Sequence, residues 1–374
     1  MKIVALQTHT CQVPIDRRVG QVAETKGFRF HSQIVLVGVQ TDVGLTGWGE
    51  VNGSPDWSGE TQAGAKSLIE QHFAPRLLGE DPRQIRLCLK KLEKTRGNSF
   101  AKAGIEMALF DLLGKSLGVP VYQLLGGAVR SRVIPLRFPI MPLPAEPSAQ
   151  VARTLVAEGF GTIKLKVGHD SLDFDLRRIG AVRDAIGPGI RLTVDANGGW
   201  TESEAIRAIP ELDRLGVAFL EQPVHRENLE GLARVRRRST LPIMADEAVF
   251  TSKSAWQCLK LGACDILSVY PGKHGGLLPT LEIVAMAEAA GVQCAIGSNV
   301  EWDLASSAMA HLAVALPNIT VEQHAADIIG PVFHTTRCVT TPLYTGRGTV
   351  ELPDAPGLGL TLDPQVMEKS QSIN

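Results

Sequence analysis

The sequence predicts an α/β protein in which a (β/α)₈ barrel is joined to a smaller α+β domain. A chain of 374 residues exceeds what one compact core usually serves, so a large domain with a smaller companion is expected. From about residue 133 onward, short apolar runs alternate with amphipathic stretches of helical length. This alternation calls for parallel strands joined by right-handed crossovers.

The first 125 residues have the pattern of an α+β domain. The stretch QIVLVGVQTDVGLTGWGE predicts a hairpin, because two β-branched apolar runs are joined through Asp42 and Gly44. Two later stretches, SLIEQHFAPRLLG and AKAGIEMALFDLLGKSLG, carry apolar residues at helical spacing. The second ends in a glycine followed by Val119-Pro120, which is a typical helix stop.

Residues 126–340 are predicted to form the barrel, which contains eight strand candidates. They are VIPLRFPI, GTIKLKV, IRLTVDAN, VAFLEQP, LPIMADEAV, DILSVYP, VQCAIGSNV and NITVEQ. A closed barrel fits this number of strands, each separated by a helix, better than an open sheet does. Residues 341–374 contain another extended stretch, GRGTVELP, and we expect this segment to return to the first domain.

The composition argues against several classes of partner. Hydrophobic residues make up 44% and charged residues 21%, which is ordinary for a soluble globular protein. The formal net charge is -1 and no Lys/Arg-rich run occurs, which disfavours nucleic acid or an anionic membrane as a partner. No segment is apolar enough to span a bilayer, and the amino terminus lacks the pattern of a signal peptide. The six cysteines form no CxxC pair, so we expect reduced thiols and a cytoplasmic location.

Two lysines stand at the end of the second predicted strand, IKLKVG. Side chains alternate along a strand, so Lys164 and Lys166 share one face while Ile163 and Leu165 take the other. If the lysines point into the barrel, each raises the cost of charging the other, which lowers a pKa toward the range of a general base. An isolated pair of this kind is usually two solvated lysines at a strand end, so its interpretation depends on its neighbours.

The next three predicted strands each end in an acid: Asp195 in VDAN, Glu221 in LEQP and Asp246 in ADE. Catalytic groups of barrel enzymes lie at the carboxyl ends of the strands. Three carboxylates that converge there suit a hard cation such as Mg²⁺. Any one of these acids could instead cap the helix that follows it. Three in succession, beside a lysine pair, favour the metal site.

Together these residues suggest a mechanism. A carboxylate substrate would chelate the cation, and the cation would stabilise the enediolate that forms when Lys166 takes the α-proton. Asn197 shares a face with Asp195 and could donate a hydrogen bond to the substrate carboxylate.

The ordered series of motifs resembles the enolase superfamily and, within it, the muconate lactonizing (muconate cycloisomerase) subgroup. TDVGLTGWGE and AKAGIEMALFDLLGKSLGVPVYQLLGG resemble its capping-domain segments. The barrel segments follow in the family's order as IKLKVG, VDANGGW, LEQPV, ADEAV, KHGGL and GSNVEWDLASSAMAHLA. The resemblance covers nearly the whole chain. It implies a modified (β/α)₈ TIM barrel under an α+β capping domain formed by the amino-terminal region and the carboxy-terminal tail.

The resemblance also implies roles for the residues already singled out. Asp195, Glu221 and Asp246 would bind Mg²⁺, or Mn²⁺ in its place. Lys166 would be the acid/base residue, and Lys164 would tune its pKa and contact the substrate carboxylate. The resemblance further implies a homo-oligomer that acts on a small carboxylate.

Substrate choice in this subgroup comes largely from two capping-domain loops, which map near Arg17–Gly27 and Val51–Glu60. In the second loop, Pro55 and Trp57 are candidates to line the substrate pocket, and the alternative is an ordinary exposed loop. Glu301, which follows the seventh strand, is expected at the rim of the pocket.

The sequence departs from the subgroup at the sixth strand, where a second catalytic lysine normally precedes a K-x-G-G type motif. In DILSVYPGKHGGL that position is Tyr270, and Lys273 occupies the later basic position beside the pocket. A phenol with a pKa near ~10 is a poor base at neutral pH but a serviceable acid. Tyr270 could protonate a leaving group or only line the pocket, and a local bulge could bring Lys273 into the vacant role. Further acid/base candidates are His274, His324 and His334.

This departure favours dehydration. Lys166 would remove the α-proton of a small hydroxy acid or hydroxy amino acid, and the β-hydroxyl would leave as water with help from Tyr270. Among relatives of this type, cis-3-hydroxy-L-proline dehydratases are the most similar in character. The alternatives are a racemase, epimerase or cycloisomerase of a small carboxylate, and a non-catalytic binding protein on the same fold. The binding protein is the least favoured, because the lysine pair and the three acids are all present.

Overall fold

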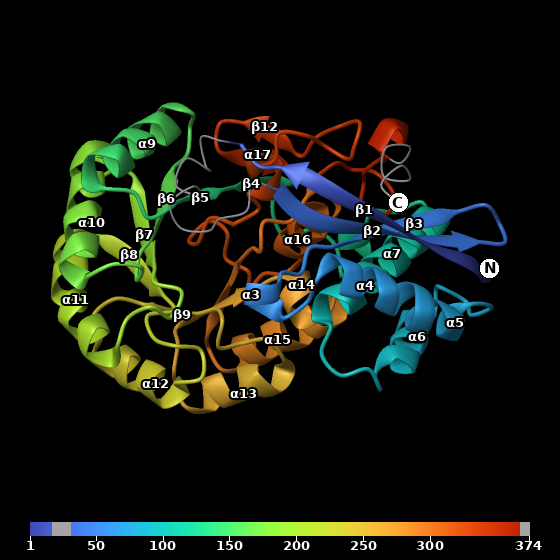
Figure 1. Ribbon diagram of the computed structural model, residues 1–374, viewed down its shortest axis with the longest axis horizontal. Coiled ribbons are helices and arrows are strands. Elements are labelled where there is room, and N and C mark those ends of the chain that lie inside the picture. Colours follow the sequence, from blue (N-terminus) through green and yellow to red (C-terminus); the bar gives the residue numbers. More distant parts are fainter. Residues whose placement is uncertain (17–30, 367–374) are drawn as a thin grey trace.

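The structure, a computed structural model, describes residues 1–16 and 31–366. An amino-terminal part is built around an antiparallel sheet, and a barrel is built around parallel strands (Figure 1). This is the predicted α/β architecture, in which an α+β domain accompanies a TIM-like domain. Within the described ranges, no helix has the length and apolar character needed to cross a bilayer. All six cysteines are buried free thiols, as expected.

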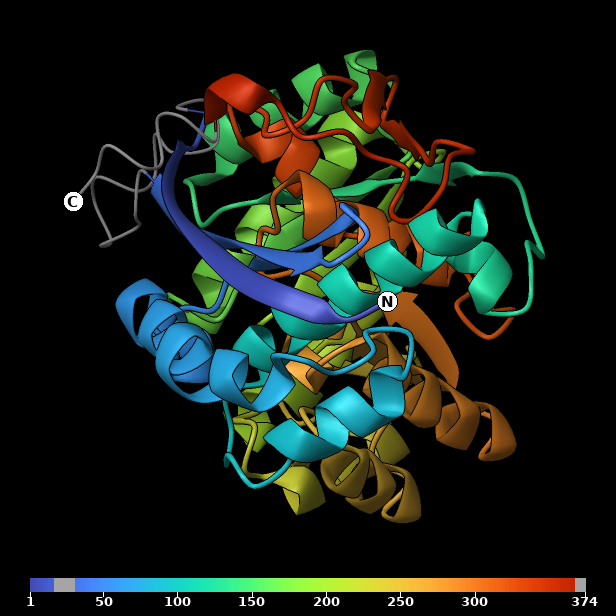
Figure 2. The same ribbon diagram turned by 90° about the vertical axis from the view of Figure 1, so that its right-hand side faces the viewer.

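The amino-terminal sheet is antiparallel, with the strand order β1-β2-β3 (Figure 2). Its strands are β1 (Ile3–Pro14), β2 (His31–Thr41) and β3 (Thr46–Val51). The predicted hairpin is the β2–β3 pair. In its turn, the N–H of Gly44 donates to the carbonyl of Thr41 over 3.1 Å, and the φ of 79° at Gly44 favours glycine.

Several helices follow or precede the strands of this part. They are α3 (Pro55–Ser58), α4 (Gln62–Leu68), a π-helical turn (Ile69–Phe73), α5 (Ala74–Leu77), α6 (Ile85–Leu92), α7 (Ser99–Leu117) and α8 (Val121–Leu124). Among them, α4, α5, α7 and the π-helical turn contact the sheet. A Cβ added to Gly49 would lie 1.9 Å from the carbonyl oxygen of Gly104. Helix α7 therefore contacts β3 backbone to backbone, which explains the glycines in the motif TGWGE.

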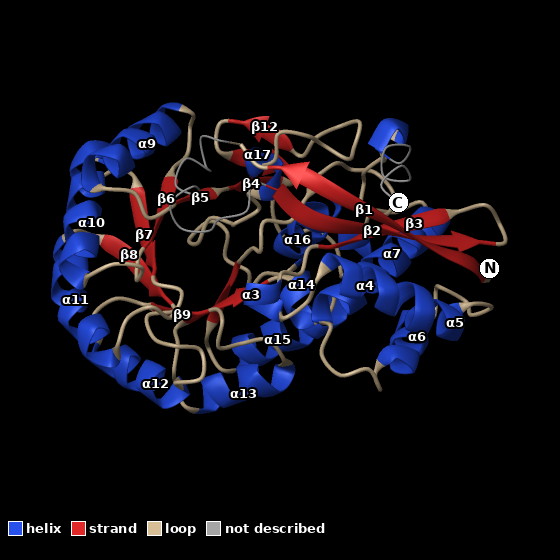
Figure 3. Cartoon of the chain, viewed as in Figure 1, coloured by secondary structure: helices blue, strands red, loops and turns tan. Residues whose placement is uncertain are grey.

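The barrel sheet has seven parallel strands in sequence order (Figure 3). They are β5 (Arg137–Ile140), β6 (Thr162–Lys166), β7 (Arg191–Asp195), β8 (Val217–Glu221), β9 (Ile243–Ala245), β10 (Ile266–Val269) and β11 (Gln293–Ile296). The helices are α9 (Ala145–Ala157), α10 (Leu172–Ile186), α11 (Glu202–Arg214), α12 (Leu229–Arg238), α13 (Ser252–Lys260), α14 (Pro271–His274), α15 (Leu277–Ala289), α16 (Asp303–Ala315) and α17 (Gly330–Phe333). Helices α9–α13 form an outer arc around strands β5–β9 (Figure 1).

The eighth predicted strand, NITVEQ, does not form a regular strand in the part of the chain that the structure describes. This edge carries only two isolated parallel bridges, Ile319↔Cys294 and Ala326↔Leu136. Between them, the N–H groups of Gln323 and His324 donate to the carbonyl of Thr320. The prediction was wrong for this element, because a local turn uses backbone groups that a strand would have offered to its neighbours.

The first predicted strand, VIPLRFPI, divides where its hydrogen-bond partners change. The N–H of Leu136 donates to Gly348 in the tail (2.8 Å), whereas the N–H of Arg137 donates to Ala326 at the barrel edge (3.0 Å). The earlier half, β4 (Val133–Pro135), therefore joins a separate sheet of order β12-β13-β4. Its other strands are β12 (Tyr344–Gly346) and β13 (Thr349–Glu351).

The tail also contacts the amino-terminal part. Gly357 exchanges backbone hydrogen bonds with Val119 and Val121, and the N–H of Leu358 donates to Asp111 Oδ1 over 2.8 Å. These contacts place the tail between the two parts. The division of the chain at residues 125 and 340 stays a prediction.

Two buried carboxylates of the amino-terminal part accept hydrogen bonds from the first turns of barrel helices. Glu50 accepts from the N–H groups of Trp302 (2.6 Å) and Ala305 (3.1 Å) at the start of α16. Glu106 accepts from Leu277 and Leu278 at the start of α15. These N–H groups have no partner within a helix, so the acids satisfy them and join the two parts. Burial raises the pKa of each acid to about 8.

Replacing His311 by Asn should make the protein less sensitive to acid. His311 is fully buried, accepts from the N–H of Tyr122 over 3.0 Å, and has its pKa lowered by burial to about 3. In the unfolded chain this histidine takes up a proton below pH 6.5, whereas in the folded chain it does so only near pH 3. As the pH falls from 6.5 toward 3, the unfolding free energy therefore decreases by up to about 1.4 kcal/mol per pH unit. Asn keeps an acceptor but does not titrate. Urea unfolding at about pH 7 and about pH 5 measures the effect, and an unaltered pH dependence in H311N would contradict it.

Candidate functional site

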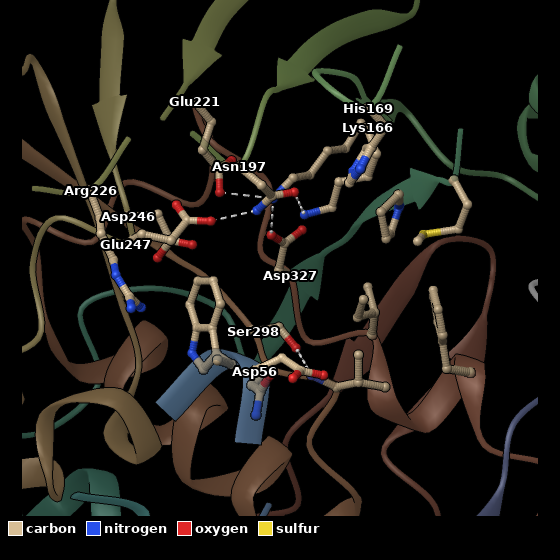
Figure 4. Close-up of a pocket in the computed structure, with 18 of the residues that line it drawn as sticks. Asp56, Lys166, His169, Asn197, Glu221, Arg226, Asp246, Glu247, Ser298 and Asp327 are labelled. Carbon is tan, nitrogen blue, oxygen red and sulfur yellow. Dashed lines mark hydrogen bonds and ion pairs between the residues drawn. The ribbon is translucent and has the colours of Figure 1, made fainter. Parts of the chain in front are cut away.

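A cavity of about 620 Å³ lies at the carboxyl ends of the barrel strands, facing α3 of the amino-terminal part (Figure 4). Predicted site residues that line it are Trp57, Lys164, Lys166, Asn197, Glu221 and Asp246. The structure therefore brings together residues from four barrel strands and from the predicted loop Val51–Glu60. The other predicted loop, Arg17–Gly27, lies outside the described residues.

Lys164 lies at the centre of a buried group of acids. Its Nζ is 2.9 Å from Asp195 Oδ2, 2.9 Å from Glu221 Oε1 and 3.0 Å from Asp327 Oδ2. Burial alone would lower the pKa of Lys164, but the three carboxylates outweigh burial and raise the pKa well above its ordinary value. The sequence-based expectation concerned a lowered pKa for one lysine of the pair; that lysine is not Lys164, because its nearest charges are negative.

Lys166 is the more accessible lysine. Its side chain is 20% exposed, and its Nζ lies 2.6 Å from Asp195 Oδ2 and 2.9 Å from Asn197 Oδ1. Figure 4 shows the Lys166 side chain entering the pocket from β6, next to His169. The Lys166 amine is therefore open to the cavity, whereas Lys164 is enclosed by carboxylates.

The three predicted metal ligands lie close to these lysines and are nearly fully buried. Burial raises the pKa of the Asp195 carboxyl, but Lys164 and Lys166 outweigh burial and lower the pKa overall. Burial, together with the charges of Asp195 and Asp246, raises the pKa of Glu221 to about 7. Asp246 Oδ1 lies 2.6 Å from Lys273 Nζ.

The chemistry of these donors fits a divalent cation. In the described part of the chain, no three His, Cys, Asp or Glu side chains form a ready-made set of metal ligands, and the ammonium groups lie among the acids instead. Glu221 Oε2 and Glu247 Oε2 are buried without hydrogen-bond partners, and burial with neighbouring acids raises the pKa of Glu247 to about 8. Arg137 Nη2 lies 3.7 Å from Glu221 Oε2, beyond hydrogen-bond distance. Carboxylate oxygens that accept no hydrogen bond, at an excess of negative charge, are the donors that Mg²⁺ takes.

Asn197 and Trp57 lie on two sides of the cavity. Asn197 adopts a φ of 43° in the left-handed region, and its Nδ2 donates to Glu247 Oε1 over 2.7 Å. Its amide thus bridges Lys166 and Glu247. Trp57 belongs to α3, whose first residue is Pro55, and its ring lies 5.9 Å from that of Phe250. A proline at this position favours the start of the helix that carries the indole.

Tyr270, Lys273 and Glu301 are buried and are not among the cavity-lining residues. The Tyr270 hydroxyl has no hydrogen-bond partner of ordinary geometry, although Trp57 is near enough to lower its pKa. Burial dominates and raises that pKa well above its ordinary value. Lys273 Nζ donates to Ser268 O (2.7 Å) as well as to Asp246. Whether these residues act on the substrate stays a prediction.

The histidines proposed as acid/base candidates do not line this cavity. Burial lowers the pKa of His324 and of His334 to about 4, and that of His274 well below its ordinary value. Neutral, buried imidazoles of this kind contribute to packing, so these three residues are structural in this arrangement.

Sequence reasoning missed Asp327, which lines the cavity. Besides contacting Lys164, its carboxylate accepts from the buried Arg137 guanidinium at 2.8 and 2.9 Å. Asp327 directly follows Ala326, the last paired residue at the eighth strand position. The other acids were identified because each ends a predicted strand. Asp327 would have been identified in the same way if the predicted eighth strand had been extended to HAAD. Glu247, Arg226 and Asp56 also line the cavity.

Two family models match the chain. The mandelate racemase / muconate lactonizing enzyme N-terminal domain matches residues 7–126, and the enolase C-terminal domain-like model matches residues 147–366. The chain belongs to the enolase superfamily, in the mandelate racemase / muconate lactonizing enzyme family. Members of this family typically depend on a divalent metal.

Relatives in this family match over almost their whole length. The L-Ala-D/L-Glu epimerase of Bacillus subtilis is 33% identical over 96% of this chain and 97% of that protein. Muconate cycloisomerase 1 of Rhodococcus opacus is 33% identical over 97% and 96%. The structure of N-succinyl Arg/Lys racemase from Bacillus cereus superposes with a TM-score of 0.92 at 29% identity, covering 99% of this chain and 98% of that one. This enolase-superfamily enzyme therefore abstracts the α-proton of a carboxylate, and these relatives are isomerases.

Replacing Lys164 by Met should cost about 3–5 kcal/mol of unfolding free energy, because three buried carboxylates would lose the ammonium group that they share. Added Mg²⁺ should restore part of this loss by replacing the missing positive charge. Urea unfolding with and without Mg²⁺ measures both effects. Lys166→Met is the matched control and should cost less, since Lys166 is partly exposed and pairs with one carboxylate. Equal losses in the two variants would contradict the shared role of Lys164.

Proposed function

We propose that this enzyme dehydrates a small β-hydroxy carboxylate, with cis-3-hydroxy-L-proline as the best candidate substrate. The observation that carries the proposal is that Lys166 is the more accessible of the two lysines that line the cavity. Lys164 is held by three acids, and Tyr270 is buried outside the cavity wall. A reaction that needs a base on one face of the α-carbon fits this arrangement better than one that needs a base on each face.

Asp195, Glu221 and Asp246 would hold Mg²⁺, with Mn²⁺ as a substitute. When bound, the cation supplies stabilisation of the negative charge that develops on the substrate carboxylate. Lys164, which also contacts Asp327 over 3.0 Å, would orient that carboxylate. This division of labour leaves proton transfer to Lys166.

The proposed reaction begins when neutral Lys166 removes the α-proton, which yields an ammonium group on the same face of the substrate. In a syn elimination, the C–O bond to the β-hydroxyl then breaks, a C=C bond forms, and a proton joins the departing hydroxyl to give water. Lys166 can return the proton that it took, so the buried position of Tyr270 is compatible with this step. Tyr270 would then support Trp57 from behind the pocket wall.

Isomerisation is the second candidate, and the relatives favour it. The proteins most similar to this chain include epimerases, a racemase and cycloisomerases. Membership in the muconate lactonizing subgroup and a homo-oligomeric state remain expectations.

A panel of candidate substrates separates the two reactions. The first group contains β-hydroxy acids with cis- and trans-3-hydroxyproline, and the second contains L-Ala-L-Glu, N-succinyl-L-arginine and muconate. Each is incubated with Mg²⁺ in D₂O. Loss of water from none of the first group would overturn the dehydratase proposal.

Replacing Lys166 by Met should abolish exchange of the α-proton with D₂O, with a loss of about 10²–10⁴-fold, because a positioned general base contributes that much. Proton NMR of a turned-over or exchanging substrate measures the loss. Calorimetric titration with Mg²⁺ is the control, since Lys166→Met keeps the three acids and removes a positive charge beside Asp195, so the affinity for the cation should not fall. A variant that still exchanges the α-proton at the wild-type rate would exclude Lys166 as the base.

Tyr270→Phe separates the one-base reaction from a two-base inversion. If Lys166 both takes and returns the proton, the rate of water loss should fall far less in the variant than the ~10²-fold expected when a proton-transfer group is removed. Phe keeps the ring beside Phe100, so packing is preserved. Rates of water loss and of α-deuteration are compared with those of the wild type. A variant that exchanges the α-proton but no longer inverts configuration would support isomerisation instead.

A further inference from the structure

Val300 has a backbone conformation that a β-branched residue rarely adopts. Its φ is 61°, in the left-handed region where the Cβ is crowded by the backbone. In the described ranges the other non-glycine residues with positive φ are not β-branched: Asn98, Asn197, Gln222 and Arg347. Strain of this kind persists only where the surroundings over-determine the conformation, and it concentrates at ligand sites. Val300 lines the cavity.

Hydrogen bonds within its own loop hold Val300 in place. The N–H of Val300 donates to Ser298 Oγ over 2.8 Å. The buried carboxylate of Glu301 accepts from the Ser298 hydroxyl and, over 2.9 Å, from the N–H of Asn299. Glu301 was expected at the pocket rim. In the structure it is buried, and its carboxylate binds Ser298 and Asn299, the two residues that precede Val300.

The amino-terminal part fixes the same loop from outside. Asn52 Nδ2 donates to the carbonyl of Asn299 over 3.1 Å, and Asn299 Nδ2 donates to the carbonyl of Asn52 over 2.7 Å. Asn52 directly follows β3, at the beginning of the loop that carries Trp57. The strained loop is thus fastened to the part of the chain expected to choose the substrate.

The Val300 loop also contacts an apolar wall. A Cβ added to Gly330 would lie 1.3 Å from the carbonyl oxygen of Glu301, so the two backbones touch. The segment around Gly330 carries Ile329 and Phe333, and the apolar residues lining the cavity besides Trp57 are Pro139, Met141, Val300, Ile329 and Phe333. Figure 4 shows Ser298 and Asp327, which come from these two loops, below Lys166 and Asn197 in the view.

We propose that Val300 determines substrate size. The strained loop holds its side chain as a fixed stop beside the apolar wall, so a carboxylate whose carbon chain extends toward Val300 is rejected even though the whole cavity has a volume of about 620 Å³. A glycine would relieve the strain at no cost in contacts within the loop backbone, so a valine is expected here only if its side chain is used. The inference rests on the proposed carboxylate site and adds the size class that this site accepts.

The test compares the binding of two carboxylate probes in the presence of Mg²⁺. Lactate is the compact probe and 2-hydroxyhexanoate is the long one, and calorimetry measures both affinities without requiring turnover. Wild-type protein should prefer lactate. Val300→Gly should shift the ratio of the two affinities toward 2-hydroxyhexanoate by about tenfold or more, the effect of added or removed methylene-sized space in an apolar pocket.

Two further variants keep the result interpretable. Arg347→Gly relieves a comparable strain, since Arg347 has a φ of 55°, but this residue lies between β12 and β13 and is not among the cavity-lining residues. It should leave the ratio unchanged. Val300→Ala keeps the strained backbone and shortens the side chain, so it should shift the ratio in the same direction as Val300→Gly. Thermal unfolding shows which variants are folded.

The outcomes separate this inference from the proposed function. If wild-type protein binds lactate but the ratio is unchanged in both Val300 variants, Val300 does not set substrate size and the proposed function stands. An equal shift in Arg347→Gly would also overturn the role of Val300. If wild-type protein binds neither probe with Mg²⁺, the proposed function fails and this inference fails with it.

Discussion

The barrel mouth depends on the ammonium group of Lys164, which lies within 3.0 Å of three buried carboxylates. Buried charges are tolerated only when they are paired, because removing an isolated carboxylate from water costs far more than folding can supply. Arg137 adds a second buried cation through Asp327. The compensation is incomplete, since the pKa of Glu221 stays raised at about 7. The buried charges of the site are therefore paired well enough for the protein to fold, and the remaining negative charge can attract a divalent cation.

Strand register produces this cluster with little help from loops. Lys166 is the Cα partner of Asp195 across β6 and β7, and Asp195 is the partner of Glu221 across β7 and β8. Neighbouring strands are separated by roughly 4.8 Å, so charged residues at equal height come within contact of one another. A one-residue slip of β6 would turn both lysines toward the outer helices and would remove the base from the cavity.

The amino-terminal part contributes shape. Its acids Glu50 and Glu106 accept from the first turns of α16 and α15, which fixes how α3 and the loop beginning at Asn52 face the barrel mouth. The family relationship accounts for α-proton abstraction, and we propose that the barrel residues perform it. We propose that discrimination among carboxylates depends instead on residues such as Trp57 and Val300, which line the cavity from the two parts of the molecule.

The sequence by itself determined the fold class and the positions of the charged residues, because strand alternation and acids at strand ends are local patterns. It did not determine the eighth strand or the division of VIPLRFPI, since both depend on which distant segment offers a hydrogen-bond partner. Only the tertiary structure raised the pKa of Lys164, added Asp327 to the cluster and placed Tyr270 behind the cavity wall. The reason is physical: the pKa of a side chain and its access to the cavity depend on neighbours that are far away in the chain, and the sequence does not show those neighbours.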